Sequence, residues 1–410
     1  MSAQNKYRYS YGGALIDAKE KKAINRIVNA NWWPSGKETV LMEKEAAKFL
    51  GVKYGILANS GSSAGLLALA SLELPRGSEV IIPATTFPTI FNIIPQCGLV
   101  PVVVDSKIGT YNLDPKELEK AITKKTKAII CVHAVGNPVD MPAVMKIAKK
   151  LGKKYGHKIW VLEDCCDSWG GTLQERKQLG SFGHISFTSF HAAHIVAMGQ
   201  GGGVFTNDKE LARRVRMYRD WGRQSDIPRR TNGNKWKSLP ADYDSRFIYE
   251  KIGYNLSPLE LQAAMGRVQL RKTGKIKALR KRNFHYLYKH LSNFPDLVMP
   301  TWVKGADPSW FAFPLSTKGD RGKLVAHLEK NGIETRSMFA GRIDLHPAYA
   351  NIKMRKVGKL EEATFILHNS FWIGVHPRYE KKDLNYVVKV FEKYYKGQNS
   401  EKERVFKRVL

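Results

Sequence analysis

Cysteine and long apolar segments are both scarce in this sequence. The four cysteines among 410 residues, Cys97, Cys131, Cys165 and Cys166, are too few for a disulfide framework and lack zinc-ligand spacing. No stretch approaches the run of about 18 apolar residues that a transmembrane helix needs, and residues 1–13 lack the apolar core of a secretory signal. We therefore expect a cytoplasmic protein in a reducing environment, with no membrane span and no resident metal.

Acidic residues are also few. The chain has 67 Lys and Arg against 37 Asp and Glu, a formal net charge of +30. An excess of this size favours anionic partners, such as nucleic acid, an acidic membrane surface or phosphorylated small molecules. The basic residues are spread along the chain among acidic ones, and no nucleic-acid-binding motif is present. We interpret the charge as a general basic surface to which a phosphate-rich substrate contributes, and we do not expect nucleic-acid binding.

What the sequence does contain is an alternation of short apolar segments with helical patterns. Such segments, bounded by turn residues, are typical of strands in a sheet that is buried on both faces. The predicted strands are residues 54–58, 79–82, 100–104, 127–132, 159–162, 185–188 and 203–206. The alternation predicts an α/β fold.

The pattern changes after Pro300 to a mixture of strands and helices without the regular alternation. This change predicts a large domain over residues 1–275, including the N-terminal helices, and a small α+β domain over 276–395. Residues 396–410 are charged and are predicted to form a frayed basic tail. Residues 223–244 are polar and aperiodic, which predicts a long loop.

Two strand ends carry candidate chemistry. Ser60-Gly61-Ser62 lies between a predicted strand and a helix, where free N–H groups and the helix dipole can hold a phosphate; a plain N-cap turn would have the same residues. Glu163-Asp164 ends another strand, and ligands of open α/β sheets bind outside such ends. A carboxylate there could pair with a protonated ring nitrogen, or could simply be a helix N-cap or a solvated acid.

A third segment, residues 189–203, carries two histidines and ends in three glycines. The glycines Gly201–Gly203 predict a tight bend against a ligand. His191 and His194 have a spacing that could place two metal ligands together, but no third ligand accompanies them. We therefore expect no metal here, and we interpret His191 as a wall residue.

The order of these motifs resembles a known family. The segments are SGSS at 60–63, TTF at 85–87, GNPVDM at 136–141, EDCCD at 163–167, SFHAAHIVAMGQGGG at 189–203 and GYNLSPLELQAAMG at 253–266. Together they resemble the pyridoxal-phosphate sugar aminotransferases, the DegT/DnrJ/StrS family, over about residues 32–377. The resemblance implies the aspartate-aminotransferase-like fold (fold type I of pyridoxal-phosphate enzymes), with a mixed seven-stranded sheet, a small C-terminal α+β domain and a homodimer.

The resemblance also implies a role for each matching residue. The cofactor phosphate would be held by Ser60, Gly61, Ser62 and Ser189, and by Asn255 from the neighbouring subunit. Phe87 would stack on the pyridine ring, and Asp164 would pair with the ring nitrogen and keep it protonated. Asp167 stands where the aminotransferases have a glutamine near the ring hydroxyl.

One departure from the family pattern decides the expected reaction. The aminotransferases have a lysine that binds the cofactor covalently, and the matching residue here is His194; no lysine lies between Gln178 and Asp208. Imidazole cannot form that bond, but it can move protons near neutral pH. The exchange resembles the nucleotide-sugar 3-dehydratases, which use pyridoxamine phosphate without a covalent link. His194 and Asp164 are therefore the predicted catalytic residues.

The resemblance implies a lyase that removes the C3 hydroxyl of a GDP- or CDP-linked 4-keto-6-deoxy hexose, with glutamate restoring the amine form of the cofactor. Such a step belongs to the synthesis of 3,6-dideoxysugars of surface polysaccharides such as lipopolysaccharide O-antigen. One branch of these enzymes uses an iron–sulfur cluster, which we do not expect because residues 224–244 contain no cysteine. The alternatives are a sugar aminotransferase, a non-catalytic regulator with the same fold, and a nucleic-acid-binding protein.

Overall fold

The computed structural model describes residues 7–224, 238–240 and 243–409, with Ser245 and residues 398–409 described by their backbone alone. Much of the predicted 223–244 loop therefore lies outside the described residues. A mixed eight-stranded sheet forms the centre of the molecule, in the order β1-β9-β8-β5-β4-β2-β3-β14. Its strands are β1 (Tyr54–Ala58), β2 (Glu79–Pro83), β3 (Val100–Val104), β4 (Thr126–Val132), β5 (Trp160–Asp164), β8 (Ile185–Ser189), β9 (Gly202–Thr206) and β14 (Arg355–Lys356).

Seven of these strands are the ones that the sequence predicted, and β14 adds two residues at the edge. Only β9 is reversed: it pairs antiparallel with β1 and β8, and all other pairs are parallel. The alternation of side chains explains the two-sided core. In β2, Val80 and Ile82 belong to one apolar cluster and Ile81 to another, because successive residues point to opposite faces.

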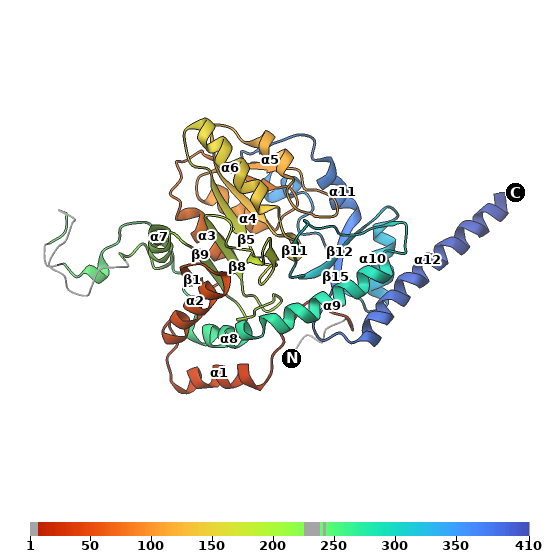
Figure 1. The fold of residues 1–410 in the computed structure, drawn as a ribbon, viewed down its shortest axis with the longest axis horizontal. Coiled ribbons are helices and arrows are strands. Elements are labelled where there is room, and N and C mark those ends of the chain that lie inside the picture. Colours follow the sequence, from red (N-terminus) through yellow and green to blue (C-terminus); the bar gives the residue numbers. More distant parts are fainter. Residues whose placement is uncertain (1–6, 225–237, 241–242, 410) are drawn as a thin grey trace.

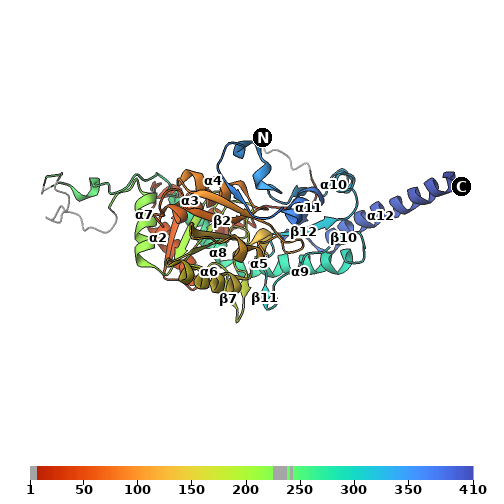
Figure 2. The ribbon, with the colours of Figure 1, turned by 90° about the horizontal axis from the view of Figure 1, so that it is seen from above.

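Helices cover both faces of the sheet (Figures 1 and 2). They are α2 (Lys37–Leu50), α3 (Gly61–Ala70), α4 (Pro88–Gln96), α5 (Pro115–Ala121), α6 (Met141–Tyr155), α7 (Lys209–Arg219) and α8 (Glu260–Arg271), whereas α1 (Ala18–Asn29) packs on α8. Leu67, Phe91 and Leu211 from α3, α4 and α7 pack in one cluster, and Leu118 and Val144 from α5 and α6 pack in the other. This is the layered α/β arrangement that the sequence predicted.

A second sheet, wholly antiparallel, follows in the order β10-β12-β15-β13. Its strands are β10 (Leu297–Val298), β12 (Ala312–Thr317), β13 (Thr335–Ser337) and β15 (Ser370–Gly374), and it is accompanied by α9 (Thr273–Leu291), α10 (Arg321–Lys330), α11 (Glu361–Asn369) and α12 (Lys381–Val409). Figure 1 shows α9 leading from α8 to this sheet. The predicted domain boundary at residue 275 stays a prediction. One strand from beyond that boundary, β14, pairs with β3 in the central sheet.

The predicted tail continues the last helix of the chain as far as Val409, and its fraying stays a prediction. α12 continues through residues 396–409 as helix, and it extends away from the body of the molecule in both views (Figures 1 and 2). The tail is rich in Lys, Glu and Arg, which are good helix formers, and it follows directly on a helix whose first half is packed.

A small third sheet joins β6 (Thr172–Leu173), β7 (Lys177–Gln178) and β11 (Ala306–Asp307). Among the described residues, no helix is both long and apolar enough to span a membrane.

Candidate active site

The candidate residues lie at one edge of the central sheet. β5 ends at Asp164 and β8 ends at Ser189, and these two strands are parallel neighbours. β9 begins at Gly202, which pairs with Ser189 on one side and with Ala58, the last residue of β1, on the other. The loop after β1 therefore lies beside the end of β8, although the two are more than a hundred residues apart in the chain. Ligands of this fold class bind at such a place, outside the ends of neighbouring strands.

The Ser60-Gly61-Ser62 loop is pressed closely against its neighbours. A Cβ atom on Gly61 would lie 2.5 Å from the Cβ of Ser189, and one on Gly202 would lie 2.2 Å from the carbonyl oxygen of Ser60. The hydroxyl of Ser60 accepts a hydrogen bond from the backbone N–H of Ser63 at 3.1 Å, so Ser60 is the N-cap of α3. The loop is therefore both an N-cap turn and a cradle whose helix N–H groups can receive a phosphate.

The aromatic and amide side chains predicted to touch the cofactor are exposed. Phe87, the N-cap of α4, has 55% of its surface exposed, so its ring is available for stacking. Asn255 is also exposed, and the next residue, Leu256, accepts a hydrogen bond from the N–H of Asn59 at 2.8 Å. Asn255 thus lies beside the phosphate cradle of its own chain, and its contact with a second subunit stays a prediction.

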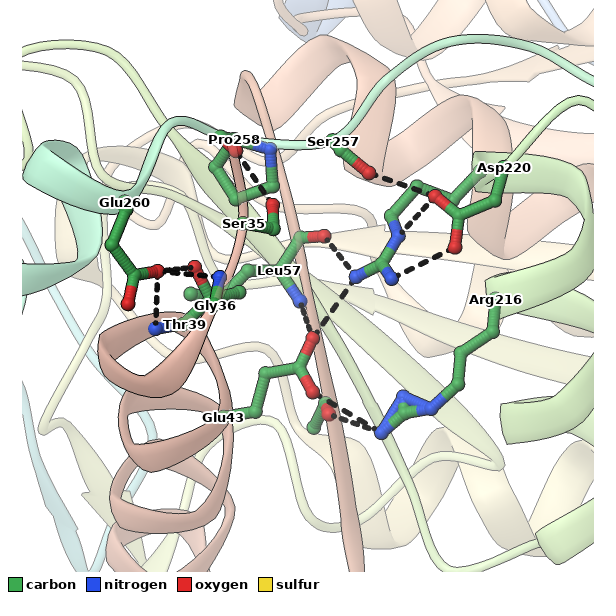
Figure 3. Close-up of polar contacts among 12 residues, drawn as sticks. Ser35, Gly36, Thr39, Glu43, Leu57, Arg216, Asp220, Ser257, Pro258 and Glu260 are labelled. Carbon is green, nitrogen blue, oxygen red and sulfur yellow. Dashed lines mark hydrogen bonds and ion pairs between the residues drawn. The ribbon is translucent and has the colours of Figure 1, made fainter. Parts of the chain in front are cut away.

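A partly buried polar network fixes the segment that carries Asn255 (Figure 3). Ser257 donates to Asp220 at 2.7 Å, and Asp220 pairs with Arg219 at 3.0 Å. Arg219 also contacts Glu43 at 3.0 Å, and Glu43 accepts from the N–H of Leu57 at 2.9 Å. The network therefore links the Asn255 segment to the end of β1, immediately before the phosphate cradle.

The same segment is anchored to the start of α2. The Glu260 carboxylate, 2% exposed, accepts hydrogen bonds from the N–H of Gly36 at 2.7 Å and from the N–H and hydroxyl of Thr39 at 3.1 and 2.7 Å. Ser35 donates to the carbonyl of Pro258 at 2.7 Å. The free N–H groups at a helix N-terminus stabilise a buried carboxylate, so this acid needs no ligand to explain it.

Two carboxyl groups lie close together at the end of β5. Asp164 accepts a hydrogen bond from the N–H of Cys166 at 2.9 Å, and burial raises the pKa of its carboxyl above the ordinary range. Burial, and then the nearby charge of Asp164, raises the pKa of Asp167 to about 8. Asp167 is therefore protonated at neutral pH, whereas a cation bound against Asp164 would favour the charged form of that group.

His194 faces Asp167 from the loop between β8 and β9. Its Nδ1 lies 3.4 Å from Oδ1 of Asp167 and has no hydrogen-bond partner among the described residues. Its ring centroid lies 5.2 Å from that of Phe311. Burial, with the charges of His191 and Arg280, lowers the pKa of His194 to about 3. The imidazole is therefore neutral at physiological pH, which is the form that can accept a proton.

The segment from Phe190 to Gly201, which carries His194, folds back on itself, and the predicted contact of its glycines with a ligand stays a prediction. Phe190 donates its N–H to Gly201 at 2.9 Å, and Ala192 donates to Gly199 at 2.9 Å. His191 is exposed, and its Nδ1 accepts the N–H of Ala193 at 3.2 Å. Its predicted role, to line the site without taking part in catalysis, stays a prediction.

Sequence reasoning missed a buried arginine behind this site. Arg280 on α9 is 1% exposed and donates to the carbonyl of Phe311 at 2.6 Å; burial lowers its pKa to about 10, against the attraction of Asp167. Its guanidinium therefore fixes the residue whose ring packs on His194. One signal could have found it: Arg280 follows Ile276 and precedes Phe284 by one helical turn each, on the buried face of α9.

Aromatic residues of the N-terminal segment and the second sheet, also missed from the sequence, complete the wall around Phe311. The ring of Tyr11 lies 5.0 Å from that of Trp372 and 6.3 Å from that of Phe311. A Cβ atom on Gly12 would lie 3.1 Å from the Cβ of Ala193, the neighbour of His194. The start of the chain is thus packed against the candidate catalytic loop.

Comparison with known proteins identifies the fold and the family. The model of the DegT/DnrJ/EryC1/StrS aminotransferase family matches residues 14–392. The chain belongs to this family. Three relatives illustrate its range. RfbH of Salmonella typhimurium, a lipopolysaccharide biosynthesis protein, is 38% identical over 93% of this chain and 91% of its own length. A dTDP-4-dehydro-2,6-dideoxy-D-glucose 3-dehydratase of Saccharopolyspora spinosa is 36% identical over 92% and 84%. A GDP-4-keto-6-deoxy-D-mannose 3-dehydratase of Yersinia pseudotuberculosis is 33% identical over 88% and 92%.

Solved structures of the family agree with this fold. The E. coli GDP-4-keto-6-deoxy-D-mannose 3-dehydratase with bound hydrated PLP has a TM-score of 0.85 and 29% identity, covering 94% of this chain and 99% of that one. A GDP-4-keto-6-deoxymannose 3-dehydratase with a trapped PLP-glutamate geminal diamine has a TM-score of 0.86 and 28% identity, covering 93% and 100%. These findings confirm the predicted family, the aminotransferase-like fold and the classification as a pyridoxal-phosphate-dependent enzyme.

The residues at this edge of the sheet fit that cofactor. The cradle at Ser60 suits the phosphate, Asp164 suits a protonated ring nitrogen, and Phe87 leaves a ring face free. Two buried polar atoms without a partner among the described residues lie in the same loops, Asn59 Oδ1 and Thr86 Oγ1. Buried polar groups are normally paired, so a polar ligand at this place accounts for them.

Proposed function

We propose that this protein is a nucleotide-sugar 3-dehydratase that removes the C3 hydroxyl of a nucleotide-linked 4-keto-6-deoxy hexose. The observation that carries the proposal is His194, a partly buried, neutral imidazole 3.4 Å from Asp167, at the position where the aminotransferases have their covalent lysine. No lysine lies between Gln178 and Asp208 to replace it. Relatives named as 3-dehydratases support the reaction.

Some residues of the site would bind the cofactor, and another would transfer protons. Ser60, Gly61, Ser62 and Ser189 would bind the cofactor phosphate, and Asp164 would hold the proton on its ring nitrogen. When bound, pyridoxamine phosphate supplies an amine for the sugar ketone and a ring that accepts electrons.

His194 is the group that moves protons. With Nδ1 facing Asp167, Nε2 is the nitrogen left to accept a proton at the reacting centre and to return it to the leaving hydroxyl. Phe311 and Arg280 hold the imidazole from behind, since the ring of Phe311 packs on it and Arg280 binds the Phe311 carbonyl. Burial of this group keeps it neutral and ready to act as a base.

The finer parts of the proposal are the substrate, the amine donor and the assembly. We propose glutamate as the donor, a homodimer in which Asn255 reaches the neighbouring site, and a GDP- or CDP-linked sugar. The relatives named for GDP-linked sugars support the GDP-linked substrate, and the relative solved with a PLP-glutamate adduct supports glutamate as the donor. No iron–sulfur cluster is part of the proposal, because residues 224–244 contain no cysteine.

The test is a reaction with defined substrates. Purified protein is incubated with pyridoxal phosphate, glutamate and a GDP-, CDP- or dTDP-linked 4-keto-6-deoxy sugar, and the products are measured by mass. We expect a 3-deoxy product with one nucleotide and none with His194→Asn. An amino sugar would instead establish an aminotransferase, and no product with any substrate, together with no conversion of the cofactor by glutamate, would favour a non-catalytic protein.

A further inference from the structure

A group of lysines lies far from the candidate active site, at the opposite end of β5. Lys146, Lys149 and Lys153 of α6, together with Lys158, line a hollow of about 530 Å³ that we call the α6 hollow. Lys158 lies just before β5, whereas Asp164 ends that strand. The hollow and the candidate active site therefore lie at opposite edges of the central sheet.

These lysines are not neutralised within the protein. All four are exposed, and within the part of the chain that the structure describes no carboxylate lies within 4.0 Å of their ammonium groups. Asp208 acts on Lys158 only from a greater distance. By contrast Lys150, on the same helix but outside the hollow, pairs with Glu119 at 2.7 Å. The hollow thus concentrates positive charge that an anion from outside can neutralise.

A histidine adds a further donor at the rim. Nδ1 of His184 accepts the N–H of Val161 at 2.9 Å, so the ring proton of the neutral imidazole is on Nε2. Burial and the charge of Lys158 lower the pKa of His184 to about 4, which keeps it neutral. The ammonium group of Lys158 is held 3.5 Å from the ring centroid of Trp160. The hollow is thus lined by four lysines without an acidic partner within 4.0 Å among the described residues and by His184, residue types that bind phosphate oxygens.

The floor of the α6 hollow is apolar. It consists of Met145, Ala148, Gly152 and Ile159, of which all but Met145 are buried. An inorganic anion bound at the rim would leave this surface in water, whereas an apolar group beside the anion would cover it at a gain of about 25 cal/mol per Å². The combination therefore favours an organic anion over a bare ion.

We propose that the α6 hollow is a second binding site, for an organic phosphate monoester, with the phosphate at the lysine rim and His184 and the apolar part on the Met145–Ile159 floor. This site would use part of the positive excess of the chain. It does not depend on the reaction proposed above, since none of its residues lies at the cofactor edge of the sheet.

The experiment uses hexyl phosphate as the probe. Binding to the full chain, loaded with one equivalent of pyridoxal phosphate per chain, is measured by calorimetry at low salt, and inorganic phosphate and hexanol are measured in parallel. We expect hexyl phosphate to bind at least about tenfold more tightly than either one, and its affinity to fall as salt is added. Inorganic phosphate binding as tightly as hexyl phosphate would overturn the proposal.

Two matched pairs of variants locate the site. Lys149→Gln with Lys153→Gln removes two charges of the rim and should weaken hexyl phosphate binding at least about tenfold. Lys150→Gln with Lys154→Gln removes the same charge at the same spacing of α6 but outside the hollow, and should leave binding unchanged. Equal losses in both pairs would show diffuse surface charge and would overturn the proposal. Met145→Gln should weaken hexyl phosphate but not inorganic phosphate.

Binding to vesicles distinguishes a lipid phosphate from a soluble phosphate ester as the ligand. Sedimentation with phosphatidylcholine vesicles that contain phosphatidic acid, a lipid phosphate monoester, would identify a lipid as the ligand if Lys149→Gln with Lys153→Gln abolishes it. Binding of hexyl phosphate without binding to vesicles would identify a soluble metabolite. Absence of both would overturn the proposal, and it would leave the 3-dehydratase proposal untouched.

Discussion

At the scale of single residues, His194 decides between two kinds of enzyme. Its backbone N–H donates a hydrogen bond to the carbonyl of His191, its ring packs on Phe311, and its Nδ1 faces Asp167. Its position therefore does not depend on the cofactor. His194→Asn should keep cofactor binding, because the phosphate cradle and Asp164 remain, but should lose roughly 10²–10⁴-fold in turnover. Absorbance titration with pyridoxal phosphate and steady-state kinetics measure the two effects.

The same position predicts the covalent state of the cofactor. Borohydride should fix no pyridoxal phosphate to the wild-type chain, since no lysine replaces His194 in residues 178–208. His194→Lys should become labelled by borohydride and should lose dehydration, because the lysine competes with the free amine form. A labelled lysine in the wild-type protein would contradict the dehydratase proposal and support an aminotransferase.

Asp167 predicts how stability changes with pH. Its pKa is about 8 in the folded protein, because it is buried near Asp164, against about 4 in an unfolded chain. Because the folded protein holds this proton more tightly than the unfolded chain, protonation of Asp167 favours the folded state. That contribution to stability is present in full below about pH 4 and is lost as pH rises toward about 8.

Asp167→Asn removes that titration while keeping the shape of the side chain. In the absence of cofactor, the wild-type Tm should therefore fall relative to the variant between pH 5 and 8, and the difference should become constant above about pH 9. Thermal melts of both proteins across this range are the measurement, and the charged neighbours Asp164 and Arg280 are the same in both. Parallel Tm curves would show that Asp167 is ionised in the folded protein at neutral pH.

At the scale of elements, the phosphate cradle depends on the close approach of α3, β8 and β9. Gly61→Ala would put a Cβ atom 2.5 Å from the Cβ of Ser189, so one of the two elements must move. We expect at least about a tenfold loss of pyridoxal-phosphate affinity, since the N–H groups of the α3 N-terminus would be displaced with it. Gly274→Ala is the control, because nothing lies within 4 Å of a Cβ atom there, and unchanged affinity in both variants would exclude Gly61 from the cradle.

At the scale of the whole molecule, the family resemblance predicts that Asn255 serves the site of a neighbouring subunit, and its exposed side chain is free to do so. If Asn255 serves the neighbouring subunit, a dimer of one His194→Asn chain and one Asn255→Ala chain has one intact site and one doubly altered site. Two inactive variants, mixed after unfolding and refolding in equal amounts, should then recover about a quarter of wild-type activity. No recovery, or a monomeric solution mass with full activity, would show that each chain completes its own site.

The sequence by itself determined the elements that local pattern controls. The seven main strands and the helices between them follow from apolar periodicity and turn residues, since a strand buried on both faces must be apolar along its whole length. The motif order was sufficient for the family, and the exchange of lysine for His194 was visible without a structure. The helical continuation of α12 into the charged tail was not predicted, although its Lys, Glu and Arg residues favour a helix.

Only the tertiary structure decided which distant residues share an environment. The contact of His194 with Asp167, the burial of Arg280 behind Phe311 and the packing of Gly12 against Ala193 join segments separated by tens to hundreds of residues. No periodicity encodes such contacts, because they depend on how the two sheets pack and on the reversed direction of β9. The pKa values of Asp167 and His194 likewise follow from burial, which is a property of the folded molecule and not of either residue alone.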